Sequence, residues 1–273
     1  MRISVPASSA NLGAGFDVLG MALTIPAEVG ILEGDVPEKA EIARGAHPAA
    51  TAFSSAGGRG QVWVKSSIPS GRGLGFSGAV RVGAIALALQ QSSRDDVLRT
   101  RRQEIFERAA VLEGHGDNVA ASVFGGVVVV ADGSVAGVPL AVDPAIVVWI
   151  PSFKTNTSES RATLPGSVTR VDAVFNMARS SLFVAALASG EVGLLREATR
   201  DRLHQDARLA LAQPSREALE TALSTSAWAA WLSGSGPTVA VMCDRQDAEL
   251  VTAAWPSGRS MIVGIDRVGA HWL

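Results

Sequence analysis

Cysteine is almost absent from this chain of 273 residues, which contains only Cys243. A single thiol excludes a framework of disulfides and fits a reducing, cytoplasmic setting. Because Cys243 lies in an apolar run, we interpret it as a small core residue.

The chain also lacks an excess of positive or negative charge, and it has no long apolar run. The net charge is −2 and no basic block occurs, which argues against a general nucleic-acid-binding protein. Residues 1–6 lack the apolar stretch of a signal peptide. Apolar runs such as Val127–Ala131 and Ala145–Ile150 are far too short to cross a bilayer. With 47% apolar residues, the chain is expected to fold into one long or two ordinary domains and to need no membrane.

Glycine, in contrast, is abundant, and it is densest in I-P-S-G-R-G-L-G-F-S-G-A (residues 68–79). An apolar run, residues 80–89, follows at once and predicts a helix that is buried on most faces. Glycines let a backbone approach a ligand closely, and the N-terminus of the following helix offers free N–H groups and a positive dipole end. The stretch therefore predicts a site for an anion, most often a phosphate.

Better-known glycine patterns fit this stretch less well. G-L-G-F-S-G matches G-x-G-x-x-G, but Pro69 and Ser70 interrupt the strand that a dinucleotide fold needs before it. The protein-kinase pattern lacks its V-A-I-K, H-R-D and D-F-G partners, and a Walker A loop needs a lysine that is absent here. A hydrolase with Ser77 as nucleophile and His115 or His204 as base stays an alternative, because G-F-S-G-A is one residue short of a nucleophile elbow.

The first half of the chain predicts a mixture of strands and helices. Residues 2–5 indicate a short strand, and residues 6–17 a loop of small and turn-forming residues that contains Asn11 and Asp17. Residues 18–25 fit a strand or a helical turn. Helices are expected at 48–55 and from about 94 to 113, with Ser93 as the N-cap of the second, and strands at 61–65 and 127–130.

The second half predicts the order β-α-β-β-α-β, which is that of a ferredoxin-like sandwich. The expected strands are residues 146–150, 227–232, 238–243 and about 261–265. The expected helices are residues 172–189, 191–203, about 214–225 and 247–254, and residues 155–161 are expected to form a polar loop.

A dense polar cluster, E-G-H-G-D-N (residues 113–118), ends the helix expected at 94–113. Two interpretations are equally supported by the residues alone. In the first, Gly114 is a left-handed C-cap and the cluster is structural. In the second, Glu113, His115, Asp117 and Asn118 are functional side chains.

Five stretches together resemble the GHMP small-molecule kinases. P-S-G-R-G-L-G-F-S-G-A (69–79) resembles the family's P-x-x-x-G-L-G-S-S-A motif. The others resemble segments of one branch of that family, the homoserine kinases. They are P-A-S-S-A-N-L-G-A-G-F-D-V-L-G (6–20), E-G-H-G-D-N-V-A (113–120), S-E-S-R-A-T-L-P (158–165) and L-S-G-S-G-P-T (232–238). The matches follow the family's order from residue 6 to residue 238.

The resemblance implies an α+β fold and a reaction. Residues 1–142 would form an ATP-binding domain like ribosomal protein S5 domain 2, and residues 143–273 a ferredoxin-like α/β sandwich. The implied activity is ATP-dependent phosphorylation of the L-homoserine hydroxyl to O-phospho-L-homoserine, a step of threonine biosynthesis. ATP and Mg²⁺ are the implied cofactors. A cytoplasmic homodimer without nucleic-acid partners is the implied form.

The resemblance also implies a role for each matched residue. Ser77 and Glu113 match Mg²⁺ ligands. Asn11, Asp17, Arg161 and Arg208 match substrate-binding positions, with Asp17 attracting the ammonium and the arginines gripping the carboxylate. Asp117, His115 and Asn118 match the catalytic end near the hydroxyl. The ATP-binding positions are Pro69, Ser70, Gly71, Arg72, Gly73, Leu74, Gly75, Phe76, Ser77 and Gly78.

Three residues depart from the family pattern. Phe76 stands where the first serine of the Ser-Ser pair is usual, Gly78 where alanine is usual, and Gly116 where proline is usual. Residues 30–60 are shorter than the family's corresponding region. Two alternatives therefore stay open: a GHMP kinase for another small alcohol, and a non-catalytic binding protein with the same fold.

Overall fold

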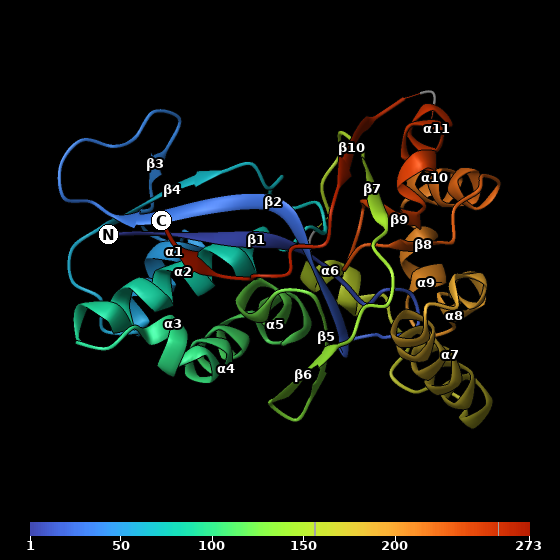
Figure 1. Ribbon diagram of the computed structural model, residues 1–273, viewed down its shortest axis with the longest axis horizontal. Helices are drawn as coiled ribbons and strands as arrows, with labels where there is room; N and C mark the ends of the chain where they lie inside the picture. The colour runs from blue at the N-terminus through green and yellow to red at the C-terminus, as the bar shows by residue number, and fades with distance from the viewer. Residues whose placement is uncertain (156, 256) are drawn as a thin grey trace.

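Two antiparallel sheets, one in each of two lobes, organise the chain (Figure 1). The structure is a computed structural model and describes residues 1–155, 157–255 and 257–273. The first lobe holds the N-terminal half of the chain, and the second lobe holds most of the C-terminal half. The α+β fold expected from the sequence is confirmed by the antiparallel sheets and the helices packed on them.

The first sheet has the order β11-β1-β2-β4-β3, with β5 paired to β2 and β6 paired to β5. Its strands are β1 (Arg2–Ala10), β2 (Leu19–Ile31), β3 (Glu41–Ile42), β4 (Val62–Ser66), β5 (Val127–Ala131), β6 (Ser134–Val138) and β11 (His271–Trp272). The expectation of a loop from residue 6 is wrong for residues 6–10, which continue β1 and pair with β2. These residues are small and buried on both faces, so they lack the alternation that marks a half-buried strand.

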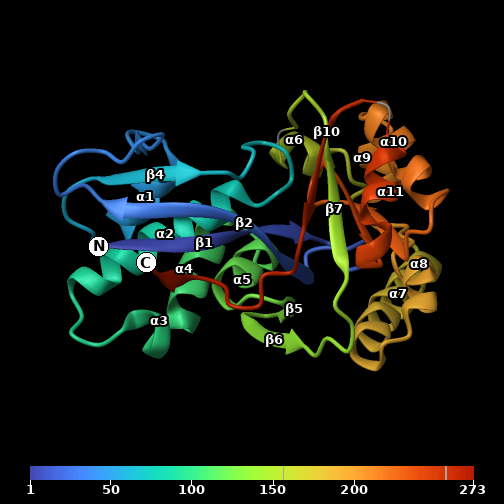
Figure 2. The same ribbon diagram turned by 45° about the horizontal axis from the view of Figure 1, so that its top comes forward.

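The helices of the first lobe pack on this sheet either directly, as α1, α2 and α5 do, or through other helices, as α3 and α4 do (Figure 2). They are α1 (Pro48–Ser55), α2 (Phe76–Gln91), α3 (Val97–Thr100), α4 (Arg102–Glu113) and α5 (Asp117–Phe124). Helix α2 packs against both β1 and β2 as well as α1, α4 and α5, and its residues are buried nearly all round, as the apolar run predicts. The single helix expected from residue 94 to 113 is instead two: Asp96 rather than Ser93 caps α3, and Arg101 leaves the helical conformation before α4.

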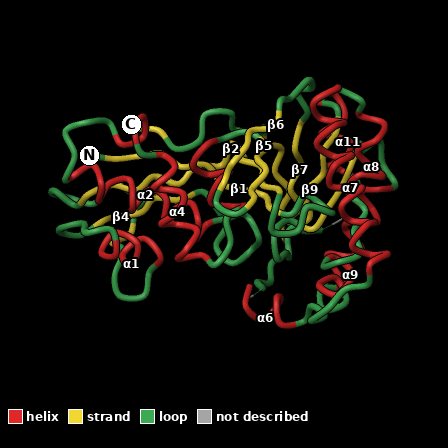
Figure 3. The backbone as a smooth tube through the Cα atoms, turned by 90° about the horizontal axis from the view of Figure 1, so that it is seen from below, coloured by secondary structure: helices red, strands yellow, loops and turns green. Residues whose placement is uncertain are grey.

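The second sheet has the order β10-β7-β9-β8. Its strands β7 and β9 lie side by side in Figure 3. Its strands are β7 (Ala145–Ile150), β8 (Ala229–Leu232), β9 (Val239–Cys243) and β10 (Arg259–Val263). The helices are α6 (Thr157–Ala162), α7 (Arg170–Ser189), α8 (Leu195–Ala198), α9 (Gln205–Leu209), α10 (Gln213–Leu223) and α11 (Ala248–Ala253), with 3₁₀ turns at Val192–Leu194 and Arg245–Asp247. Strands and helices follow one another in the β-α-β-β-α-β order that the sequence predicts.

Two local expectations for the second half are wrong, and one strand is missed. The polar loop expected at 155–161 contains helix α6 instead. The helix expected at 191–203 is a 3₁₀ turn followed by the single turn α8. The missed strand is β11, which returns to the first sheet. It pairs with β1 so that Trp272 lies opposite Ile3.

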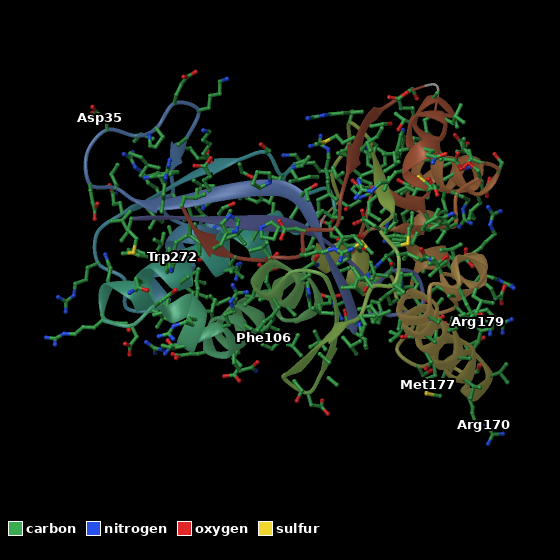
Figure 4. All side chains as sticks on the ribbon, viewed as in Figure 1. Asp35, Phe106, Arg170, Met177, Arg179 and Trp272 are labelled. Atoms are coloured by element: carbon green, nitrogen blue, oxygen red, sulfur yellow. The ribbon has the colours of Figure 1, made fainter. Side chains whose placement is uncertain are left out.

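Helix α7 is, among the described residues, the one helix whose length and composition would allow it to span a membrane. Only 22% of its most apolar window is buried. It packs along one side against α8. On its exposed side, Arg170 and Met177 project away from the lobe (Figure 4).

Contacts between the glycine-rich loop and the second lobe join the two halves of the chain. Arg72 donates from Nε to the carbonyl of Pro151 at 2.9 Å and from Nη2 to that of Ser152 at 2.7 Å. The hydroxyl of Ser233 lies 2.6 Å from the Gly73 carbonyl. These bonds hold the loop against the segment that follows β7 and against the β8–β9 turn, so a cavity beside the loop is walled by both lobes.

Candidate active site

A pocket of about 470 Å³ lies beside the glycine-rich loop and between the lobes. All the residues to which the sequence assigned a site role line it. They are Asn11, Asp17, Pro69, Ser70, Gly71, Arg72, Gly73, Leu74, Gly75, Phe76, Ser77, Gly78, Glu113, His115, Asp117, Asn118, Arg161 and Arg208. The fold therefore brings five separate stretches of the chain to one cavity, while the role of each residue stays a prediction.

The loop has its shape because its glycines lie in the left-handed region. Gly73 has φ +72° and Gly75 φ +69°. A Cβ on Gly75 would come within 2.0 Å of the Ser8 hydroxyl oxygen, so the backbone here has room for glycine alone. Gly75 is the N-cap of α2 and has no side chain with which to cap it. The first N–H groups of α2 consequently remain available to an anion in the pocket.

Ser77, in the first turn of α2, meets Glu113 at the C-terminal end of α4. The Ser77 hydroxyl donates to Oε1 of Glu113 at 2.5 Å. Arg81 lies one turn further along α2, and its Nε is 2.8 Å from the same carboxylate oxygen and 3.2 Å from the Ser77 oxygen. The helix ends after Glu113 because Gly114 is a left-handed C-cap, as the structural interpretation of the cluster expects.

His115 and Asp117 form a hydrogen-bonded pair at the start of α5. Nδ1 of His115 lies 2.8 Å from Oδ1 of Asp117, which also accepts from the Asn118 backbone N–H. The Asp117 carboxylate raises the pKa of His115, although burial opposes the charged ring. Oδ1 of Asn118 in turn accepts from the Ser8 hydroxyl at 2.8 Å, so these side chains have fixed orientations.

The loop after β1 places Asn11 and Asp17 by means of uncommon backbone conformations. Both have positive φ, +69° for Asn11 and +58° for Asp17, which short polar residues tolerate better than others. Asn11 is buried; its Nδ2 donates to the Gly234 carbonyl, and its Oδ1 accepts from the Asp17 backbone N–H at 3.1 Å. The loop thus fixes Asp17 at the wall of the pocket.

Asp17 forms a bidentate ion pair with Arg161 of α6. The two guanidinium nitrogens Nη1 and Nη2 each donate to one carboxylate oxygen, both at 2.8 Å. Asp17 raises the pKa of Arg161, so this guanidinium stays charged. The Phe16 ring lies under the Arg161 guanidinium, 5.4 Å from its centre, which adds a cation–π contact. The sequence predicts separate partners for these two residues, whereas here they are paired with each other.

Arg208 is a second, much more buried arginine at the same wall. It is 5% exposed, and its Nη1 contacts the Gly234 carbonyl and Nδ1 of His204. Nε2 of His204 contacts the Gly13 carbonyl at 2.8 Å, which assigns Nε2 as the protonated nitrogen. Burial lowers the pKa of His204, so the ring is neutral and can accept from Arg208. Within residues 1–155, 157–255 and 257–273, Nε of Arg208 has no hydrogen-bond partner and no carboxylate forms a salt bridge with it.

Several wall residues were not found by sequence reasoning. Glu41, His47, Pro48 and Thr155 line the pocket, and Phe16 and Arg81 contact residues that do. Arg81 alone offers a local signal, since it is the one charge in an apolar helix and lies four residues after Ser77. The others reach the pocket through tertiary folding, which no short spacing records.

The hydrolase alternative gains no support from this geometry. In the described part of the chain, the hydrogen bonds of the Ser77 hydroxyl are with Glu113 and Arg81, not with a histidine. His115 is bound to Asp117, and His204 is buried against Gly13. Neither ring is placed to take a proton from Ser77.

Comparison with known proteins agrees with the geometry. The family described as GHMP kinases N-terminal domain matches residues 41–126, and GHMP kinases C-terminal matches residues 183–258. A homoserine kinase of Thermus thermophilus is 38% identical, over 99% of this chain and 98% of its own. One of Desulfitobacterium hafniense is 34% identical, over 100% of this chain and 94% of its own. A crystal structure of homoserine kinase from Cytophaga hutchinsonii superposes with a TM-score of 0.84 at 20% identity, covering 99% of this chain and 96% of its own, and so supports the fold.

Proposed function

The chain belongs to the homoserine kinase family of the GHMP kinases, and from this premise we propose that its pocket transfers the γ-phosphoryl group of ATP to the hydroxyl of L-homoserine. The hydroxyl oxygen forms a bond to the γ-phosphorus, the bond to the β-phosphate oxygen breaks, and ADP leaves. The hydroxyl proton goes to a base or to water. The products are O-phospho-L-homoserine and ADP.

The observation that carries the amino-acid substrate is the grouping of Asp17, Arg161 and Arg208 at one wall. An amino acid brings one ammonium and one carboxylate group. The Asp17–Arg161 pair has the charges that these two groups need, and the buried guanidinium of Arg208 lacks a carboxylate among the described residues. A bound homoserine would place its carboxylate on the arginines and its ammonium on Asp17, which replaces one ion pair by two.

The phosphate end of the pocket is supported by the glycine-rich loop. The free N–H groups at the start of α2 suit the β- and γ-phosphates of ATP. Ser77 and Glu113 lie side by side there and offer hydroxyl and carboxylate oxygens, the hard donors that Mg²⁺ takes together with phosphate oxygens. The residues present therefore fit Mg²⁺, which when bound would neutralise charge on the phosphates.

The hydroxyl end is assigned to His115, Asp117 and Asn118. Nδ1 of His115 is bound to Asp117, so the neutral ring would present Nε2 as a proton acceptor. Asn118, whose side chain is fixed by the hydrogen bond from Ser8, can orient the hydroxyl. Positioning and charge neutralisation supply most of the rate enhancement in phosphoryl transfer, so this base contributes a smaller part.

A panel assay tests the proposal. ADP release is measured with ATP and Mg²⁺ alone and then with homoserine, mevalonate, galactose or shikimate. Release stimulated by homoserine only is expected. Stimulation by another alcohol but not by homoserine would overturn the substrate, and ligand binding without turnover would favour a non-catalytic binding protein.

We also propose that the protein is a cytoplasmic homodimer, as the family suggests. Sedimentation velocity at several protein concentrations measures this directly. A species of twice the chain mass is expected, and a monomer throughout the range would remove the homodimer.

A further inference from the structure

Arg81 is a largely buried charge for which neither the sequence motifs nor the proposed mechanism has a use. It lies in α2 among apolar neighbours, all of which are buried from Val82 to Leu89. Its side chain is 18% exposed and does not line the pocket. A charge in such a place needs a partner, because an unpaired buried ion is strongly unfavourable.

The partners of Arg81 are the two side chains proposed to bind Mg²⁺. Its Nε is 2.8 Å from Oε1 of Glu113 and 3.2 Å from Oγ of Ser77, and its Nη1 donates to the Leu112 carbonyl. Oε1 of Glu113 therefore accepts from both Arg81 and Ser77. A cation that used this carboxylate would have to share it with a guanidinium.

We propose that Arg81 is a positioning residue that weakens the affinity of the Ser77–Glu113 site for a free divalent cation and thereby makes cation binding depend on nucleotide. This inference rests on the proposed function, which assigns the two ligands. Arg81 acts through Glu113 and Ser77, because it fixes their oxygens and adds one positive charge behind them.

The charges of the site explain why Arg81 weakens the binding of a free cation. Glu113 alone brings one negative charge, and the Arg81 guanidinium cancels it within hydrogen-bonding distance. The protein without nucleotide therefore offers a divalent cation a nearly neutral pair of oxygens. The phosphates of a nucleotide restore the negative charge, so the cation binds well only when both are present.

A purely structural role would predict something different. Arg81 joins α2 to the end of α4, and such an ion pair could serve only to hold the two helices together. Its removal would then lower thermal stability and leave the cation affinity of the folded protein unchanged or weaker. Cation binding therefore separates the two roles.

The experiment is a titration with Mn²⁺ followed by electron paramagnetic resonance, with and without ADP. Arg81→Gln keeps a hydrogen-bonding side chain without the charge, Arg81→Met removes both, and Arg81→Lys keeps the charge. Without ADP, the Gln and Met variants are expected to bind Mn²⁺ about tenfold more tightly than the unmodified protein. The Lys variant is expected to match the unmodified protein, and adding Glu113→Gln to Arg81→Gln is expected to abolish the gain.

Thermal unfolding identifies which variants are folded. The Mn²⁺ affinity of each folded neutral variant, Arg81→Gln or Arg81→Met, is then compared with that of the unmodified protein. An unchanged or weaker Mn²⁺ affinity in a folded neutral variant would overturn the inference, as would a gain that survives Glu113→Gln. The readout uses no homoserine. A failure of the substrate assignment in the panel assay would therefore leave this result interpretable by itself.

Discussion

Arg161 is the most exposed of the four residues proposed to bind the substrate. It is 43% exposed on its short helix, and its ion pair is with Asp17. Arg161→Ala is expected to raise the KM for homoserine roughly 10- to 100-fold, because charged hydrogen bonds contribute about 1.5–3 kcal/mol. Steady-state kinetics with each substrate varied in turn measures the effect, and the KM for ATP should not change.

Arg170→Ala is the matched control for Arg161. Arg170 is an exposed arginine at the start of α7, where it projects away from the lobe (Figure 4). The Arg170→Ala substitution should leave the KM for homoserine and the KM for ATP unchanged. An unchanged homoserine KM in Arg161→Ala would remove Arg161 from the substrate site.

Phe76 replaces a serine that is usual in the family, and its ring forms part of the pocket wall. It is half-buried, lines the pocket and meets the His47 ring edge-on, with 6.1 Å between centroids. Phe76→Ser removes this apolar wall, and the loss of about 1 kcal/mol is expected to raise the KM for ATP roughly fivefold. Steady-state kinetics with ATP varied at saturating homoserine measures this KM. A lower KM for ATP in the serine variant would instead mark Phe76 as a defect of the loop.

The His115–Asp117 pair predicts a pH-dependent contribution to stability. The pKa of His115 is raised in the folded protein, chiefly by its hydrogen bond to Asp117. The stabilisation is therefore complete below the unfolded pKa of about 6.5 and is lost as the pH rises through the higher folded pKa. His115→Gln should lower the Tm more at pH 5.5 than at pH 8.5. Equal losses at the two pH values would contradict this linkage.

At the scale of elements, the glycine-rich loop and the β8–β9 turn form a close contact between the lobes. A Cβ on Gly73, at φ +72°, would lie 2.2 Å from the Ser233 carbonyl oxygen and 2.8 Å from that of Gly236. Gly73→Ala is expected to cost about 1–3 kcal/mol or more, because backbone strain and a clash act together. Calorimetry or thermal unfolding should show a Tm lower by several degrees.

Gly133 provides the control for the clash. It has φ +83°, in the same left-handed region, but nothing lies within 4 Å of an added Cβ. Gly133→Ala therefore reports the strain alone and should lower the Tm less than Gly73→Ala. If the two variants lose the same amount, the joint between loop and turn contributes nothing beyond the strain.

At the scale of the whole molecule, β11 ties the C-terminus to the first lobe. His271 and Trp272 pair with β1, and the indole N–H of Trp272 donates to Asp96 at 2.8 Å. Deleting residues 271–273 is expected to lower the free energy of unfolding. Each kcal/mol of this loss should lower the Tm by about 2–4 °C. Trp272→Phe, which keeps the backbone pairing, should lose less. A deletion without effect on Tm would show that β1 needs no partner at this edge.

The sequence predicts the elements that have strong local signals. The buried helix at 80–89, the C-cap at Gly114 and the strands around the β8–β9 turn follow from apolar runs and glycines. It does not predict residues 6–10 as strand, because small residues buried on both faces show no alternation. It also misses β11, whose two residues become a strand only by pairing with β1.

The candidate site was predictable where motifs mark it, and less so where folding creates it. The motif residues were found, and they line one pocket. The pairing of Asp17 with Arg161 was not predicted, because the two residues are 144 positions apart and each was assigned to a different group of the substrate. The contact of Arg81 with Glu113 likewise depends on how α2 and α4 pack.

The position of β11 also has a consequence for how the protein is made. β1 precedes the other strands of its sheet along the described chain, and β11, the strand that covers its outer edge, follows them all. The backbone N–H of Leu273 donates to the Arg2 carbonyl at 3.2 Å, so the two ends of the chain meet (Figure 1). During synthesis the edge of β1 stays open to other strands until β11 has been made. Dependence on chaperones should therefore be greatest for chains still attached to the ribosome.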